Sequence, residues 1–210
     1  MARSPFWRIE TPAIFVLAYF FAAPVPFTGA QGEGTPKGKE VSTAVKAEKR
    51  EYVSSSGGYR ITCPEGWARH EGDIRPIDVI FFCRADPGMN MSVTWASAGG
   101  QKELTEAAVK EMKDMFRQSY PGYSVTAEEW RELDGAKAFC LSARHQEMET
   151  EIQSKQVMLI KGDRFYTITY TSTPALFMKH LGEFELGVGS FRTTGEKTPA
   201  MLQSPRKKNN

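Results

Sequence analysis

The sequence predicts an α+β fold in which an antiparallel β-sheet is sandwiched between helices. Predicted elements follow one another in the order strands, helix, strands, helix, which is typical of α+β domains. Two dipeptides, Asp134-Gly135 and Gly162-Asp163, each separate two strand-like segments and predict tight antiparallel hairpins. Several strand-like segments are apolar on both faces. A helix against each face of the sheet accounts for this pattern.

Three strands are predicted before the first helix, over residues 59–63, 77–83 and 90–96. Proline and glycine follow the first strand and recur in residues 86–88, where they favour turns. Four consecutive apolar residues, Val79 to Phe82, place the second strand centrally in the sheet, because both of its faces must be covered. In the third strand, apolar residues alternate with smaller or polar ones, which is typical of a half-buried strand.

The first helix is predicted from about residue 104 to 116, where apolar residues recur at three- and four-residue steps. Pro121-Gly122 ends it. Two strands then follow, over residues 123–133 and 136–147. The Asp134-Gly135 pair between them suits a turn whose central residues both need positive φ.

A second hairpin is predicted from strands over residues 152–161 and 164–173, which flank Gly162-Asp163. The last helix begins at Thr173-Pro174, where a capping hydroxyl precedes a proline at the first helical position. Gly187 and Gly189 are expected to loosen the end of this helix.

The folded unit is predicted over residues 58–191, because polar segments flank it on both sides. Residues 31–57 are rich in Gly, Lys, Glu and Ser and cannot bury enough apolar surface to offset the entropy of ordering. They are therefore predicted to form a flexible linker. Residues 192–210 end in adjacent cations and are predicted to form a disordered basic tail.

Residues 1–30 have the layout of a secretory signal peptide and predict export to the periplasm or secretion. Arg3 and Arg8 precede an apolar run over residues 13–23, and Thr28-Gly29-Ala30 offers a small-residue cleavage site. The apolar run is short, since a helix needs about 20 residues to span a bilayer. The alternative is that residues 13–23 are retained and tether the protein to a membrane.

The composition excludes several classes of protein. Hydrophobic residues make up 40% and charged residues 25% of the chain, which is typical of globular proteins and excludes wholly disordered or collagen-like ones. The net charge of +2 gives no electrostatic basis for nucleic-acid binding. We find no cofactor motif, and neither G-x-S-x-G nor H-E-x-x-H occurs.

The cysteines are Cys63, Cys83 and Cys140, and their spacing with the histidines matches no zinc motif, so no metal site is predicted. In an oxidising compartment Cys63 and Cys83 are the candidate disulfide pair, because both end apolar segments that could be neighbouring antiparallel strands. The alternative is that all three are buried thiols that pack as small hydrophobic residues.

Two histidines lie in predicted regular structure. His145 shares its strand face with Phe139 and Leu141, so it is expected to be partly buried and hydrogen-bonded. His180 lies beside Lys179 in the last helix and is expected to be solvated.

A candidate binding site consists of Trp67, Arg69, His70 and Asp73. These residues lie in a polar loop between two predicted strands, and loops held by a rigid sheet are where binding groups collect. The alternative is an ordinary exposed loop.

Four motifs resemble the PsbP-like/DcrB-like superfamily: residues 58–67, the hairpin at 133–138, the Tyr166-x-Ile168-x-Tyr170 strand, and residues 189–191. The resemblance covers about residues 58–191. It implies a PsbP-like α/β/α sandwich and a small binding, assembly or envelope-associated protein rather than an enzyme. Metal-binding residues described for photosystem members match no motif here, so the resemblance implies no metal ligand.

These observations favour an exported, non-catalytic protein that binds or helps to assemble a partner protein in the cell envelope or outside the cell. One alternative is a small-molecule-binding protein or enzyme with a pocket near Trp67 to His70. Another is the same domain tethered to a membrane by its uncleaved N-terminal segment.

Overall fold

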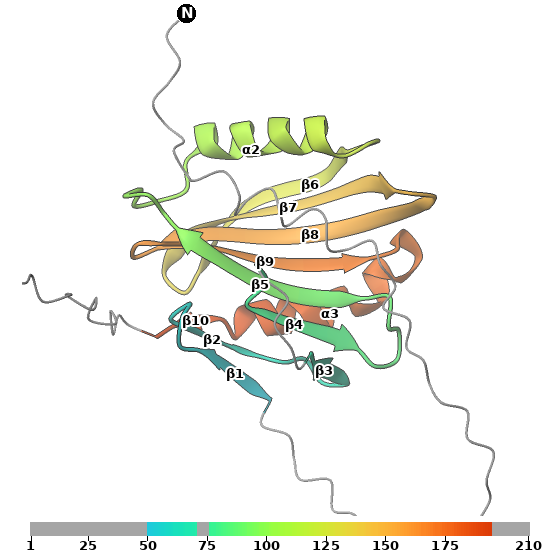
Figure 1. Cartoon of the computed structure of the whole chain (residues 1–210), viewed down its shortest axis with the longest axis horizontal. Helices are drawn as coiled ribbons and strands as arrows, with labels where there is room; N and C mark the ends of the chain where they lie inside the picture. The colour runs from blue at the N-terminus through green and yellow to red at the C-terminus, as the bar shows by residue number, and fades with distance from the viewer. Residues whose placement is uncertain (1–49, 71–75, 195–210) are drawn as a thin grey trace, which may run out of the picture.

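A computed structural model describes residues 50–70 and 76–194 of the chain. A large sheet lies between two layers (Figure 1). Helix α2 (Glu106–Ser119) covers one face, and helix α3 (Pro174–Gly189) packs on the other together with a small sheet. The predicted fold, an antiparallel sheet sandwiched between helices, is confirmed.

The large sheet has seven strands. They are β3 (Trp67–Arg69), β4 (Val79–Cys83), β5 (Asn90–Ser97), β6 (Ser124–Leu133), β7 (Ala136–Glu147), β8 (Thr150–Lys161) and β9 (Arg164–Ser172). Their spatial order is β3-β4-β5-β9-β8-β7-β6, and every neighbouring pair is antiparallel. β4 therefore lies next to the edge strand β3, and the centre of the sheet is β9.

The small sheet shows that the folded unit extends beyond residues 58–191 at both ends. It consists of β1 (Glu51–Ser54), β2 (Tyr59–Thr62) and β10 (Arg192–Thr193), in the order β1-β2-β10. β1 lies in the segment expected to be linker, and β10 in the segment expected to be tail. Backbone pairing with β2 orders both, which their polar composition did not indicate. Residues 1–49 and 195–210 lie outside the described part.

Both predicted hairpins are present, with different turns. Asp134 and Gly135 have φ of 52° and 71°, so both central residues have the positive φ of a type I′ turn. In the second hairpin only Gly162 has a positive φ, 66°, which matches the type II′ pattern with glycine first.

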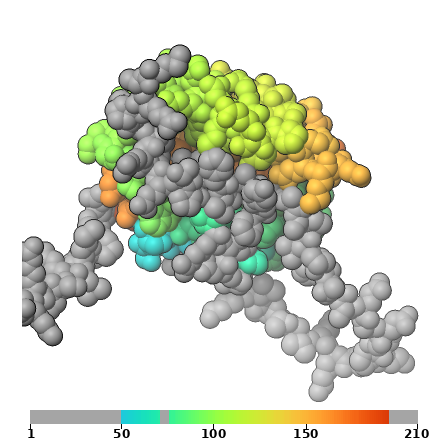
Figure 2. Space-filling model, turned by 45° about the horizontal axis from the view of Figure 1, so that its top comes forward, coloured from blue at the N-terminus to red at the C-terminus, as the bar shows by residue number. Residues whose placement is uncertain are grey.

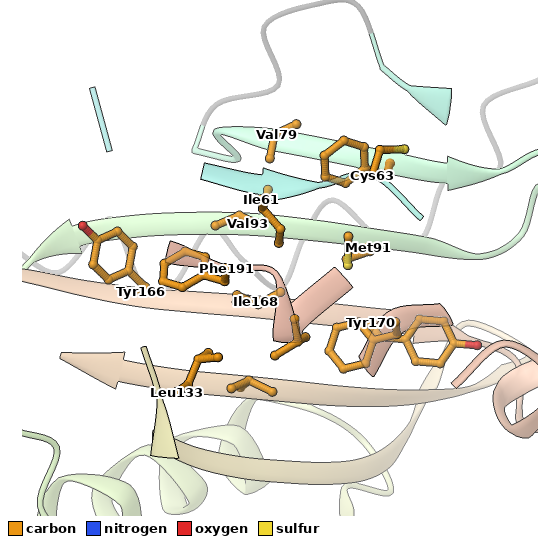
Figure 3. Close-up of a cluster of buried hydrophobic side chains, with 14 of the residues drawn as sticks. Ile61, Cys63, Val79, Met91, Val93, Leu133, Tyr166, Ile168, Tyr170 and Phe191 are labelled. Carbon is orange, nitrogen blue, oxygen red and sulfur yellow. The ribbon is translucent and has the colours of Figure 1, made fainter. Parts of the chain in front are cut away.

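Alternation along the strands divides the interior into two clusters, one on each face of the large sheet. On β9, Tyr166, Ile168 and Tyr170 point to the α3 side, where they pack with Phe184 and Phe191 (Figure 3). The threonines between them point to the α2 side. The α2-side cluster is smaller and contains, among others, Phe139, Leu141 and Met158.

The two ends of α3 differ from expectation. Thr173 occupies the N-cap position, but its side chain makes no capping hydrogen bond, so Pro174 alone supplies the expected start signal. Gly187 lies within the helix rather than loosening it. A Cβ atom there would lie 3.1 Å from the Met91 side chain, so the missing side chain lets α3 pack closely on β5.

The carboxylate of Asp134 fixes β10 to the β6–β7 turn. Its Oδ2 accepts hydrogen bonds from the Thr193 backbone N–H at 2.9 Å, the Thr193 hydroxyl at 2.7 Å and the Lys161 ammonium at 2.8 Å. Burial acts to raise the pKa of Asp134, but the hydrogen bonds from Lys161 and Thr193 outweigh it and lower this pKa below its usual value.

Asp134 is therefore expected to make stability depend on pH. Because the folded-state pKa is the lower one, its contribution is present above the unfolded-state value of about 4 and is lost as pH falls through the folded-state pKa. We expect Asp134→Asn, which tolerates positive φ, to lower the free energy of unfolding by about 1 kcal/mol at neutral pH and to match the wild type in strong acid. Urea unfolding across this pH range measures the difference.

The matched control is Asp163→Asn, which changes an exposed carboxylate in the other two-residue turn. It should keep the wild-type dependence of stability on pH. A loss of stability in Asp134→Asn that is the same at every pH would contradict a stabilising role for the ionised Asp134 carboxylate.

Candidate functional site

A pocket opens between α2 and the large sheet. α2 contributes Met112 and Phe116 to it, and the segment after the helix contributes Tyr120 and Tyr123. The sheet contributes residues of β7, β8 and β9: Leu141, Ala143, His145, Glu147, Ser154, Gln156, Met158, Phe165, Thr167, Thr169 and Thr171. We call this the α2 pocket. Figure 2 turns the α2 layer, in yellow-green, towards the viewer.

Aromatic rings form the α2 side of the pocket. Phe116 lies 6.1 Å from Tyr120 and 5.8 Å from Tyr123, measured between ring centroids, and Tyr120 lies 4.6 Å from His145. Burial raises the pKa of both Tyr120 and Tyr123 to about 12, so these phenols remain neutral hydrogen-bond donors.

The sheet side of the pocket is unusually polar for a buried surface. Thr167, Thr169 and Thr171 are each buried on β9, and Gln156 lies beside them on β8. Within the described residues, several buried atoms that belong to pocket residues make no hydrogen bond: Tyr123 Oη, Glu147 Oε2, Gln156 Oε1, Thr169 Oγ1 and Thr171 Oγ1. A buried polar group without a partner costs about 1–3 kcal/mol, so this surface is suited to a ligand that hydrogen-bonds to it.

His145 and Glu147 form one polar end of the α2 pocket. The His145 Nε2 and Glu147 Oε1 atoms lie 3.0 Å apart, and the two side chains are only 10% and 11% exposed. His145 is thus partly buried and hydrogen-bonded, as its strand face predicted. The same alternation places it in the α2 pocket together with Leu141 and Ala143.

The sequence-predicted binding residues do not converge on one site. Trp67 to Arg69 form strand β3 rather than a loop, because they pair with β4. Trp67 is buried in the α3-side cluster, and its indole N–H donates to Glu183 at 2.6 Å. His70 instead packs edge-on against Phe82, which alternation places on the opposite face of the sheet.

None of these residues lines the α2 pocket. The Arg69 guanidinium lies 5.7 Å from the centroid of the Tyr52 ring. Asp73 lies outside the described residues. The α2 pocket therefore lies at a different place from the pocket expected near Trp67 to His70.

Cys63, Cys83 and Cys140 are present as buried thiols. Cys63 and Cys83 belong to the same hydrophobic cluster, but they follow or end strands of different sheets, β2 and β4. The expectation that these two cysteines end neighbouring strands is therefore wrong. The disulfide between them stays a prediction. Burial raises the pKa of the Cys140 thiol.

His180 is buried rather than solvated, with 6% of its surface exposed. It lies three residues after Phe177 and four before Phe184, both buried, and this spacing puts all three on the inner side of α3. Its Nε2 lies 2.8 Å from Asp86 Oδ2 and its Nδ1 lies 2.9 Å from Glu183 Oε2. The spacing to the two phenylalanines is the sequence signal that would have revealed this burial.

No helix among the described residues combines the length and apolar character needed to cross a membrane.

Solved structures define the class of this fold. The solution structure of cyanobacterial PsbP (CyanoP) from Synechocystis sp. PCC 6803 is similar with a TM-score of 0.51 and 17% identity, covering 68% of this chain and 91% of that one. The crystal structure of LpqN, involved in cell envelope biogenesis of Mycobacterium tuberculosis, is similar with a TM-score of 0.52 and 11% identity. This similarity covers 64% of this chain and 82% of LpqN. The fold is therefore PsbP-like.

The DcrB family model matches residues 59–185. The chain therefore belongs to the DcrB family, which confirms the resemblance found in the sequence. No curated protein matches the sequence.

Proposed function

We propose that this chain is an exported, non-catalytic binding module of the cell envelope, which recognises a segment of a partner protein through the α2 pocket. The observation that carries the proposal is the pairing of aromatic walls with buried polar atoms that lack partners. An apolar side chain of the partner would pack beneath Phe116, while its polar groups would hydrogen-bond to Thr169 and Gln156. Aromatic pockets with a few convergent polar groups are typical binding sites.

Two further observations support the cell-envelope setting. Residues 1–30 have the layout of a signal peptide, and LpqN, whose fold is similar, is involved in cell envelope biogenesis. DcrB-family membership agrees with a small envelope-associated module. An N-terminal segment retained at residues 13–23 would instead tether the same module to a membrane.

Site-specific photo-crosslinking in the native host tests the use of the α2 pocket. A benzoylphenylalanine at Phe116 is expected to crosslink to one partner, and Ala143→Leu, which fills the pocket from β7, should reduce that crosslink about tenfold, equivalent to a loss of about 1.4 kcal/mol. Ala143 is buried and lines the pocket. A probe at Leu186, which is exposed on α3, is the matched control.

Crosslinks of equal yield from Phe116 and Leu186, or a Phe116 crosslink that Ala143→Leu leaves unchanged, would contradict binding in the α2 pocket. N-terminal sequencing of the crosslinked protein tests export in the same sample. A chain that starts near residue 31 agrees with signal cleavage, and a chain that starts at Met1 favours the tethered form.

The buried unpartnered atoms also favour a second candidate, a small polar ligand held in the α2 pocket without a partner protein. Native mass spectrometry of the protein purified from its host distinguishes the two. A bound small molecule that Ala143→Leu displaces would support this second candidate.

A further inference from the structure

We propose that Cys83, Asp86 and His180 form a binding site for a zinc ion on the α3 side of the large sheet. One ligand atom from each residue, a thiol sulfur, a carboxylate oxygen and an imidazole nitrogen, lies within 4.8 Å of the other two. Zinc binds this combination of sulfur, nitrogen and oxygen, and two ligand atoms of one tetrahedral ion lie about 3.5 Å apart. Small side-chain rotations therefore suffice to bring the three atoms around one ion.

The turn between β4 and β5 fixes two of the three ligands. Cys83 is the last residue of β4, and Asp86 follows it by three residues. The backbone N–H of Cys83 donates to the Met89 carbonyl at 3.2 Å, and the backbone N–H of Met89 donates to the Asp86 carbonyl at 3.0 Å. These two hydrogen bonds hold both ligands in one short closed segment.

The third ligand comes from α3 and is oriented by its neighbours. His180 Nδ1 lies 2.9 Å from Glu183 Oε2, and the same carboxylate oxygen accepts the Trp67 indole N–H at 2.6 Å. Histidines that bind metals commonly donate their other ring N–H to a carboxylate, which fixes the tautomer. Glu183 is thus a positioning residue, and it leaves Nε2 facing Asp86 and Cys83.

Lys179 competes with a metal ion for Asp86. Its ammonium lies 2.7 Å from Asp86 Oδ2, and its side chain is 57% exposed. The same Asp86 oxygen lies 2.8 Å from His180 Nε2, so Lys179 and His180 meet at one carboxylate oxygen. A bound ion would replace the Lys179 charge, and the exposed lysine is able to move into solvent.

The zinc site and the predicted Cys63–Cys83 disulfide exclude each other, because both need the Cys83 sulfur. No sequence motif indicates the site, because His180 is far from Cys83 and Asp86 along the chain and the spacing matches no zinc motif. The inference is independent of the proposed function, because none of its residues lines the α2 pocket.

Cobalt titration of the full-length, reduced protein tests the site, because Co²⁺ replaces Zn²⁺ and reports its ligands by absorption. We expect a saturable thiolate-to-cobalt charge-transfer band at one equivalent, together with visible bands of a tetrahedral ion, and we expect Zn²⁺ to displace both. Cys83→Ser should abolish the charge-transfer band. Cys63→Ser, at a buried cysteine of the same cluster, should keep it and also prevents disulfide formation.

Two further variants separate a metal site from a purely structural ion-pair cluster. Glu183→Gln should weaken zinc binding about 10- to 100-fold while keeping the charge-transfer band, as expected for a residue that orients a ligand. Lys179→Ala, at an exposed position, should tighten zinc binding. Absence of the band in the folded wild type, its persistence in Cys83→Ser, or unchanged zinc affinity in Lys179→Ala would each overturn the proposed ligand set.

Discussion

Phe184→Ala is expected to lower the free energy of unfolding by about 3–5 kcal/mol, because it leaves a large cavity in the core between α3 and the sheet. Phe184 is fully buried. Its ring stacks on Tyr170 of β9 with 5.3 Å between centroids and 20° between planes. Tyr170 also donates its hydroxyl to the backbone carbonyl of Phe177, which lies in the same helix, so the ring contact and the hydrogen bond together hold α3 on the central strand.

The control for this change lies two residues further along the same helix. Leu186 is 78% exposed, so Leu186→Ala should change stability by less than about 0.5 kcal/mol. Urea unfolding followed by circular dichroism measures both variants. Similar losses in Phe184→Ala and Leu186→Ala would mean that α3 does not present Phe184 to the sheet.

Local sequence signals predicted the central part of the fold well. Asp134-Gly135 and Gly162-Asp163 carry their own turn chemistry, and the strands beside them follow the expected alternation. The apolar run from Val79 to Phe82 also forms its predicted strand. The prediction that this strand is central is wrong, however, because β4 is second from the edge of the sheet, next to the short strand β3. Most of its apolar residues are buried all the same, since both faces of β4 are covered.

Elements that depend on distant pairing were not predictable from local signals. β1 and β10 are only 4 and 2 residues long, and each exists because it pairs with β2. β3 likewise depends on its pairing with β4. The turn after Glu147 was missed for another reason: Met148 has a φ of 53° without the glycine or asparagine that usually marks such a position.

The α2 pocket was not among the sites predicted from the sequence, although its signal is present. On β9, threonines alternate with large apolar or aromatic residues from Tyr166 to Thr171, which predicts one apolar face and one polar face. A polar face usually indicates solvent exposure, and here α2 lies over part of that sheet face. The position of α2 is a tertiary property, so the sequence showed the hydroxyl groups but not that they line a pocket.

The alternation of β9 also explains how one sheet supports two separate candidate sites. Its threonines face the α2 pocket, whereas Tyr170 packs with Phe177 and Phe184 on the side where α3 presents His180. A ligand in one site therefore has no direct contact with the other. Substitutions at Cys83 or His180 should leave binding in the α2 pocket unchanged if the protein remains folded.

Asp78→Ala is expected to lower the free energy of unfolding by about 3 kcal/mol, because its carboxylate joins the small sheet to the large one. Asp78 Oδ2 accepts the Tyr59 hydroxyl at 2.6 Å and the Tyr52 hydroxyl at 3.3 Å, and Oδ1 accepts the Trp95 indole N–H at 3.3 Å. Burial, and then the charge of Asp78, raise the pKa of Tyr59, so its hydroxyl remains a protonated donor. Without the carboxylate, this buried hydroxyl loses its acceptor.

A double-mutant cycle identifies the source of that loss. Tyr59→Phe removes the donor, so Asp78→Ala should cost less in the Tyr59→Phe background than in the wild type, by about 1–2 kcal/mol. Asp114→Ala, at a carboxylate on the exposed side of α2, is the matched control and should shift the urea midpoint far less. Additive losses in the double variant would show that Asp78 acts without Tyr59, and the loss would then be assigned to its hydrogen bonds with Tyr52 and Trp95.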